Sequence, residues 1–135
     1  MVANYHLTAR DIMQTEIATV LGDLSITEAA DLMRFAGTRS LLVVPRNTAE
    51  AYGIVCYSDI VYQVLAECVD PRQMTVDEVS TTPAIAVRPN DTIQEISVLF
   101  RKHQIGHAPV IDADEGLVGM VSMTDLVTEV ITEPK

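Results

Sequence analysis

Apolar residues in the first half of this chain follow two patterns, a helical spacing and short continuous runs. Each pattern predicts a different element. A spacing of three to four positions runs through ITEAADLMR at 26–34 and predicts an amphipathic helix. The runs LLVV at 41–44 and YGIVC at 52–56 favour strands, and the polar segment RNTAEA between them predicts a hairpin turn. A short strand around 18–21 precedes these elements and a helix over 58–68 follows them, so the predicted order is β-α-β-β-α.

The same order of elements occurs a second time. The paired segments, 66, 67 and 66 positions apart, are GIVCYSDIV with GMVSMTDLV, ITEAADLMR with IQEISVLFR, and DIMQT with DEVST. They predict a first repeat at 8–68, a linker at 69–74 and a second repeat at 75–133, whose short first strand lies around 84–87. Because neither copy is large enough to bury its apolar faces alone, we expect a mixed α/β fold in which two β-α-β-β-α repeats pack about a pseudo-twofold axis.

Capping signals indicate where the predicted helices begin. The S/T-x-x-E pattern at Ser25 and at Thr92 is a capping box, which starts the first helix of each repeat. At the second helix of each repeat, Ser58 and Thr124 are the predicted N-caps. An aspartate follows each of them in the first turn, where a negative charge interacts favourably with the helix dipole.

Composition and charge narrow the possible functions. A net charge of −10 argues against binding to nucleic acid or to anionic membranes, and the absence of tryptophan argues against aromatic platforms for single strands. No apolar run is long enough to span a bilayer, and the first ten residues lack the apolar core of a secretion signal. Two cysteines, predicted to be free thiols, fit a reducing compartment. We therefore expect a cytoplasmic protein without nucleic-acid or membrane partners.

Two histidines, His103 and His107, are spaced as zinc ligands on one face of a helix would be. The helix that starts after Thr92 has to end by Gly106, however, because Pro109 disfavours helix at the residue before it. His107 then lies beyond the helix, and the residue after His103 is glutamine, where a zinc hydrolase needs a glutamate base. We predict no metal site, and since no other catalytic motif is present, no catalytic residue, no cofactor and no enzymatic activity.

Three motifs carry a resemblance to a known family. They are DIM at 11–13, APVID at 108–112, and the pattern glycine, two apolar residues, Ser or Thr, any two residues and Asp, which Gly119, Ser122 and Asp125 satisfy. The chain resembles a tandem pair of cystathionine β-synthase (CBS) domains over nearly its whole length. The resemblance implies a disc-like module, commonly a homodimer, that binds AMP, ADP, ATP, S-adenosylmethionine or a dinucleotide and acts as a sensor.

The resemblance also implies roles for particular residues. The predicted frame of the adenine ring is Thr82, Ala84, Ile105 and Met120. Asp125 would accept hydrogen bonds from the ribose hydroxyls, and Ser122 would lie at the phosphate position near the N–H groups of the helix start. His107, or Arg39 from the other repeat, would bring positive charge to the phosphate. The alternatives are helix capping for the aspartate and a solvated surface position for the arginine.

The first repeat departs from the motif. Cys56 stands where the pattern has Ser or Thr, and a thiol is a weak hydrogen-bonding group. Leu42 stands where the second repeat has Pro109. Asp59 remains available as a ligand or as a capping residue, so we expect the second repeat, with Asp125, to hold the principal nucleotide site.

Two functions follow as hypotheses. In the first, the chain is a regulatory sensor that binds an adenosine-containing ligand in the cleft between the repeats, forms a homodimer and signals to a separate, unidentified protein. In the second, it is a structural or interaction module whose clefts have lost their ligand.

Overall fold

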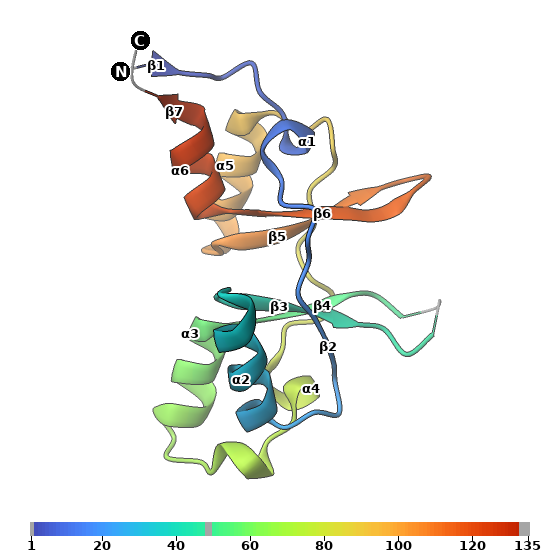
Figure 1. Cartoon of the computed structure of the whole chain (residues 1–135), viewed down its shortest axis with the longest axis vertical. Coiled ribbons are helices and arrows are strands. Elements are labelled where there is room, and N and C mark those ends of the chain that lie inside the picture. The colour runs from blue at the N-terminus through green and yellow to red at the C-terminus, as the bar shows by residue number, and fades with distance from the viewer. Residues whose placement is uncertain (1, 48–49, 133–135) are drawn as a thin grey trace. The chain divides into compact units, whose positions relative to one another are not determined.

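The computed structural model describes residues 2–47 and 50–132, and the chain forms two compact units (Figure 1). We call residues 17–84 the central unit, and residues up to 16 together with those from 85 onward the terminal unit. The units do not coincide with the sequence repeats. The first segment of each repeat lies in the unit that is built mainly from the other repeat. Residue 133, the predicted end of the second repeat, and residues 48–49 of the predicted RNTAEA turn lie outside the described residues.

The central unit is a small mixed sheet with helices. Its elements are β2 (Thr19–Leu21), α2 (Ile26–Ala36), β3 (Ser40–Val44), β4 (Gly53–Cys56), α3 (Tyr57–Ile60), the π-helix η1 (Val61–Leu65), the 3-10 helix η2 (Pro71–Gln73) and α4 (Val76–Val79). The sheet order is β2-β3-β4, with β2 parallel and β4 antiparallel to β3. The predicted hairpin and first helix are confirmed. The predicted helix over 58–68 begins earlier, at Tyr57, and passes into the π-helix.

The terminal unit joins the two ends of the chain. Its elements are β1 (Val2–Ala3), α1 (Ala9–Ile12), α5 (Ile93–His103), β5 (His107–Asp112), β6 (Gly116–Ser122), α6 (Met123–Val130) and β7 (Ile131–Thr132). β5 and β6 form the predicted hairpin, and β1 pairs antiparallel with β7. The strand predicted around 84–87 is wrong: only a single parallel bridge, from Val87 to Val110, forms there. Pro83 and Pro89 flank this segment, and proline has no N–H to donate to a ladder.

Each unit has its own apolar core, and each core contains residues from both repeats. Helix α4 of the second repeat buries Val76 and Val79 in the core of the central unit, together with Met33, Leu41 and others. Helix α1 of the first repeat contributes its buried residues to the terminal core, around Ile96 and Phe100. The expectation that one repeat cannot bury its own apolar face is met by this exchange of short helices.

The helix starts differ in part from the prediction. The capping boxes that begin α2 and α5 are confirmed. The N-caps of α3 and α6 are Cys56 and Ser122, however, and the prediction of Ser58 and Thr124 is wrong. Strands β4 and β6 run directly into these helices, so the last strand residue is also the cap.

The structure also corrects the register between the repeats at their first segments. α1 follows the N-cap Thr8 and α4 follows Thr75, an offset of 67 rather than 66. In the terminal unit Gln14 bridges to Met120, and in the central unit Thr81 bridges to Ile54. The residue that corresponds to Gln14 is therefore Thr81. Matching DIMQT to DEVST by their leading aspartates placed the register one residue off.

Gly119 lies where the segment after α1 packs against β6. A Cβ atom at this position would lie 2.8 Å from Met13 Cγ and 2.9 Å from the carbonyl oxygen of Gln14. Gly53 faces the corresponding segment of the central unit, with Thr81 carbonyl oxygen 3.2 Å from its hypothetical Cβ. Both glycines are needed for the close approach of the chain's own backbone, so this packing accounts for the glycine of the sequence motif.

We predict that Gly119→Ala destabilises the protein by about 1–3 kcal/mol, because the new methyl group overlaps a backbone carbonyl that is held by the bridge to β6. Gly106→Ala is the matched control, since its nearest neighbours, in the flexible side chain of Met123, lie 3.7 Å from the added Cβ. Urea unfolding followed by circular dichroism measures both. Equal stability of the two variants would contradict the close packing at Gly119.

Candidate functional site

Asp125 is a buried and hydrogen-bonded carboxylate of the terminal unit. It occupies the third position of α6 and is only 7% exposed. Its Oδ2 accepts hydrogen bonds from the backbone N–H and the hydroxyl of Ser122, both at 2.9 Å. Its Oδ1 accepts a hydrogen bond from Gln14 Nε2 at 3.0 Å. Each carboxylate oxygen therefore has a donor from the chain itself, which offsets the cost of burying the charge.

Asp59 has the same place at the start of α3 but fewer donors. Its Oδ2 accepts from the backbone N–H of Cys56 at 2.8 Å, the only hydrogen bond to this carboxylate from the described residues. Burial raises the pKa of Asp59, and the Cys56 hydrogen bond only partly opposes the shift. The two aspartates are thus both helix-start residues, but that of the terminal unit is the better satisfied.

Cys56 is the side chain that distinguishes the two helix starts. Burial, with a smaller contribution from the charge of Asp59, raises the pKa of the Cys56 thiol to about 12. The thiol is therefore neutral at neutral pH, which makes it a poor nucleophile and a poor donor. It cannot replace the hydroxyl that Ser122 supplies to Asp125.

The four residues predicted to frame adenine belong to two different units. Thr82 and Ala84 lie in the central unit: Thr82 Oγ1 faces Gly53, and the N–H of Ala84 donates to the Tyr52 carbonyl at 2.8 Å. Ile105 and Met120 lie in the terminal unit. Ile105 packs against the terminal core, and Met120 exchanges backbone hydrogen bonds of 2.8 and 2.9 Å with the segment after α1. The adenine frame stays a prediction.

The two predicted basic residues each lie beside a helix start. His107 is half-buried in β5, where it pairs with Ser122 of β6. Arg39 is exposed and precedes β3 of the central unit, and its carbonyl accepts a hydrogen bond from the N–H of Tyr57 at 3.0 Å. Each unit therefore has one basic residue close to its strand-to-helix junction.

Sequence reasoning missed Gln14. The residue follows the DIM motif directly, but its contact with Asp125 joins positions that are 111 residues apart. The register that aligns Gln14 with Thr81 could have indicated that the repeats differ here, because one position carries an amide and the other a short hydroxyl.

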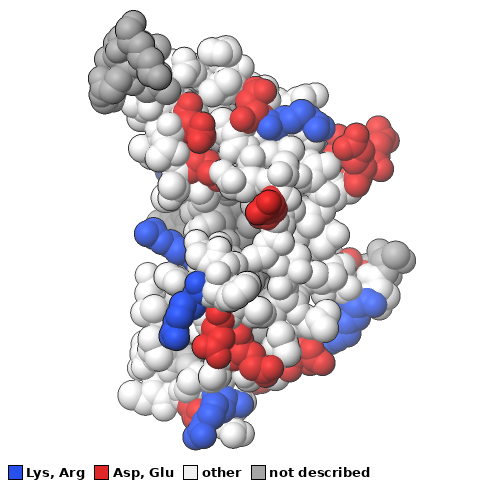
Figure 2. Space-filling model, viewed as in Figure 1, with Lys and Arg blue, Asp and Glu red and all other residues white. Residues whose placement is uncertain are grey.

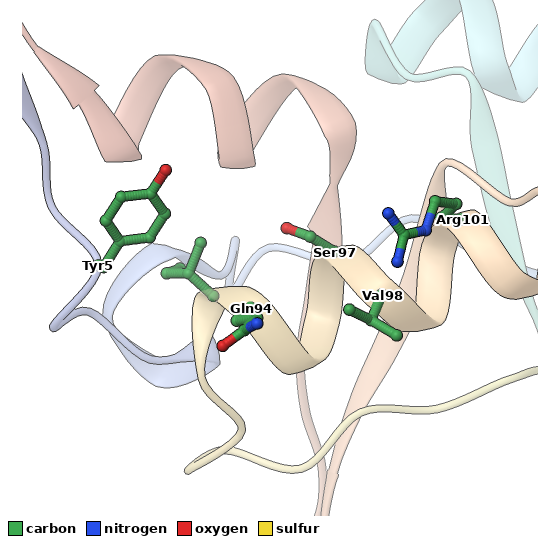
Figure 3. A pocket seen from close by; sticks show the side chains of 6 residues that line it. Tyr5, Gln94, Ser97, Val98 and Arg101 are labelled. Atoms are coloured by element: carbon green, nitrogen blue, oxygen red, sulfur yellow. The ribbon is translucent and has the colours of Figure 1, made fainter.

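A separate groove of about 560 Å³ lies along α5 (Figure 3). Its lining residues are Tyr5, Ile93, Gln94, Ser97, Val98 and Arg101. None of the predicted site residues lines it. Figure 2 shows acidic and basic side chains interspersed over one face of the molecule. Among residues 2–47 and 50–132 there is no cluster of three potential metal ligands, and no helix of this part of the chain has the length and apolar character needed to cross a membrane.

Comparison with known proteins identifies the family. The model of the CBS domain matches residues 9–66 and again residues 76–132. The chain belongs to the CBS domain family. This CBS pair is 33% identical to the CBS domain-containing protein YhcV of Bacillus subtilis over 88% of its own length and 82% of that protein.

Solved CBS structures share the fold. A hexameric CBS-CP12 protein from bloom-forming cyanobacteria is 35% identical, with a TM-score of 0.87 over 92% of this chain and 68% of that one. Hypoxic Response Protein I with two coordinated zinc ions is 30% identical, with a TM-score of 0.75 over 92% of this chain and 99% of that one. The mixed α/β fold of a CBS pair, predicted from the sequence, is confirmed.

We predict that alkylation distinguishes the two cysteines of the CBS pair. With a pKa of about 12, roughly one Cys56 thiol in ten thousand is ionised at pH 8, and only the thiolate reacts. Cys68 is exposed. Iodoacetamide at pH 8 should therefore modify Cys68 first, as peptide mass spectrometry would show, and urea should abolish the difference. Equal rates in the folded protein would contradict the burial of Cys56.

Proposed function

We propose that this CBS pair is a regulatory module that binds an adenosine-containing ligand and communicates its ligand state to a separate protein. The ligand classes are AMP, ADP, ATP, S-adenosylmethionine and dinucleotides. One observation carries the proposal: a carboxylate, Asp125, is held buried at a helix start by a neighbouring hydroxyl. A buried, ordered carboxylate is a strong acceptor for the paired hydroxyls of a ribose.

The surroundings of Asp125 fit the remaining parts of such a ligand. The dipole of α6 favours a negative group at the helix start, so the phosphate would lie beside Ser122. By the same proposal His107, which pairs with Ser122 across the hairpin, would bring positive charge to the phosphate. The strongly acidic chain repels an anion at long range, so the helix dipole and His107 have to supply the attraction. No step in this role requires catalysis, and we expect none.

The alternative is an interaction module without a ligand. It is favoured by the donors that the chain itself already supplies to both oxygens of Asp125. The neutral Cys56 thiol at the corresponding position of the central unit points the same way. The two functions differ in a single measurable property, the binding of an adenosine ligand.

Asp125→Ala should weaken binding of AMP or ATP by roughly 10- to 150-fold, because hydrogen bonds to a charged group contribute about 1.5–3 kcal/mol. Isothermal titration calorimetry measures the affinity. Asp59→Ala should have little effect if the terminal unit holds the principal site. Glu95→Ala is the matched control, since it also removes the capping carboxylate of a helix in the same unit but at α5.

The control separates a lost ligand contact from a weakened helix. If Glu95→Ala lowers affinity as much as Asp125→Ala, the effect comes from stability and Asp125 has no direct role. If Asp59→Ala alone abolishes binding, the ligand occupies the central unit. If wild-type protein binds none of the five ligand classes, the interaction module is the better description.

We also propose that the chain forms a homodimer. Large apolar side chains remain exposed on the helices of both units, namely Leu32, Phe35, Val61, Tyr62, Leu65, Val98, Met123 and Val127. Phe35 is 93% exposed and Tyr62 is 70% exposed, which is costly for a protein in water. A second copy of the same chain would cover such exposed side chains.

Light scattering at micromolar concentration should give the mass of a dimer for wild type and of a monomer for Leu65→Glu, because a charge within an apolar contact is left without water or a partner. Gln73→Glu, on an exposed polar part of the same unit, is the control and should stay dimeric. A wild-type monomer, or a dimer that Leu65→Glu leaves intact, would contradict this surface as the interface.

A further inference from the structure

The contact between Gln14 and Asp125 is built from a fixed backbone and a movable side chain. The N–H of Gln14 donates to the carbonyl of Met120 at 2.8 Å, and the N–H of Met120 donates back at 2.9 Å. These two bonds fix the Gln14 backbone on β6. Its side chain, in contrast, belongs to an exposed residue and reaches Asp125 Oδ1 through its amide. The amide can therefore leave Asp125 without loss of the β6 bridge.

The amide occupies the oxygen that Ser122 leaves available. Both bonds from Ser122 go to Oδ2, so Oδ1 is the only oxygen of Asp125 whose partner comes from outside the helix start. A carboxylate can receive only donors, and a ribose hydroxyl and the Gln14 amide are both donors. Each carboxylate oxygen offers about two acceptor positions, and Ser122 fills both positions of Oδ2. The amide fills one position of Oδ1, so the two hydroxyls of a ribose need the position that the amide holds.

The other unit shows that the fold does not require this contact. Thr81 bridges to Ile54 in the same way as Gln14 bridges to Met120. No hydrogen bond from the Thr81 side chain reaches Asp59, whose described donor is the Cys56 N–H alone. The unit without the amide still forms the strand, the helix start and the buried core. Gln14 thus makes an interaction that is specific to the terminal unit.

We propose that Gln14 is an internal competitor for the ligand, whose amide holds the ribose-binding oxygen of Asp125 until an adenosine ligand displaces it. The inference rests on the proposed function and adds a regulatory element to the same site. Gln14 precedes by three residues the point at which the chain enters the central unit.

The test is the variant Gln14→Met, which keeps the length of the side chain and removes its N–H donors. AMP and ATP, titrated by calorimetry, should bind about tenfold more tightly than to wild type, because the ligand no longer has to break a hydrogen bond to a charged group. The ligand-free variant should unfold at a lower temperature, since Asp125 has lost a donor. Gln73→Met, the same change at an exposed glutamine of the other unit, should alter neither property.

A second measurement follows the amide directly. In wild-type protein labelled with nitrogen-15, saturating AMP should shift the side-chain amide signals of Gln14 towards those of a solvated glutamine. Wild-type binding with unchanged affinity in Gln14→Met, or with unmoved amide signals, overturns the competitor role and leaves the proposed function standing. Weaker binding in Gln14→Met also overturns it, because Gln14 would then contact the ligand. Absence of binding in both proteins rejects the proposed function and the competitor together.

Discussion

Strand β6 ends at Ser122 and helix α6 begins at Met123, so the chain changes from extended to helical backbone without an intervening loop. Such a junction leaves the first N–H groups of the helix without partners, and they have to be satisfied locally. The carboxylate of Asp125 and the hydroxyl of Ser122 do so reciprocally. The same requirement fixes a buried carboxylate at the end of the hairpin, and the ligand contacts proposed for the terminal unit all depend on this group.

The two copies of this junction differ in only a few side-chain atoms. A thiol in place of a hydroxyl at Cys56, and a threonine in place of a glutamine at Thr81, leave Asp59 with one donor where Asp125 has three. The backbone is the same in kind at both places, whereas the hydrogen-bond donors around the two carboxylates differ. A duplicated module can in this way keep its fold while its two sites acquire different affinities.

Sequence patterns predicted the parts of this structure that depend on local contacts. The helical periodicity, the capping boxes at Ser25 and Thr92 and the hairpins rest on residues a few positions apart, and all are present. The N-caps of α3 and α6 were misplaced because the last residue of each preceding strand is also the cap. The prediction assumes a polar linker between the strand and the helix. The exchange of α1 and α4 and the contact of Gln14 with Asp125 depend on which segments meet in space. Periodicity carries no information about that.

The exchange also imposes an order of assembly on the chain. The central unit is one continuous segment, residues 17–84, so every part of it is available once a ribosome has released that segment. The terminal unit needs α1, made first, and β5, β6 and α6, made last. During synthesis, Ala9 and Ile12 of α1 therefore lack the apolar residues against which they pack. All residues of the central unit's core are made before those partners are. The apolar partners of α1 become available only after β5, β6 and α6 have been made.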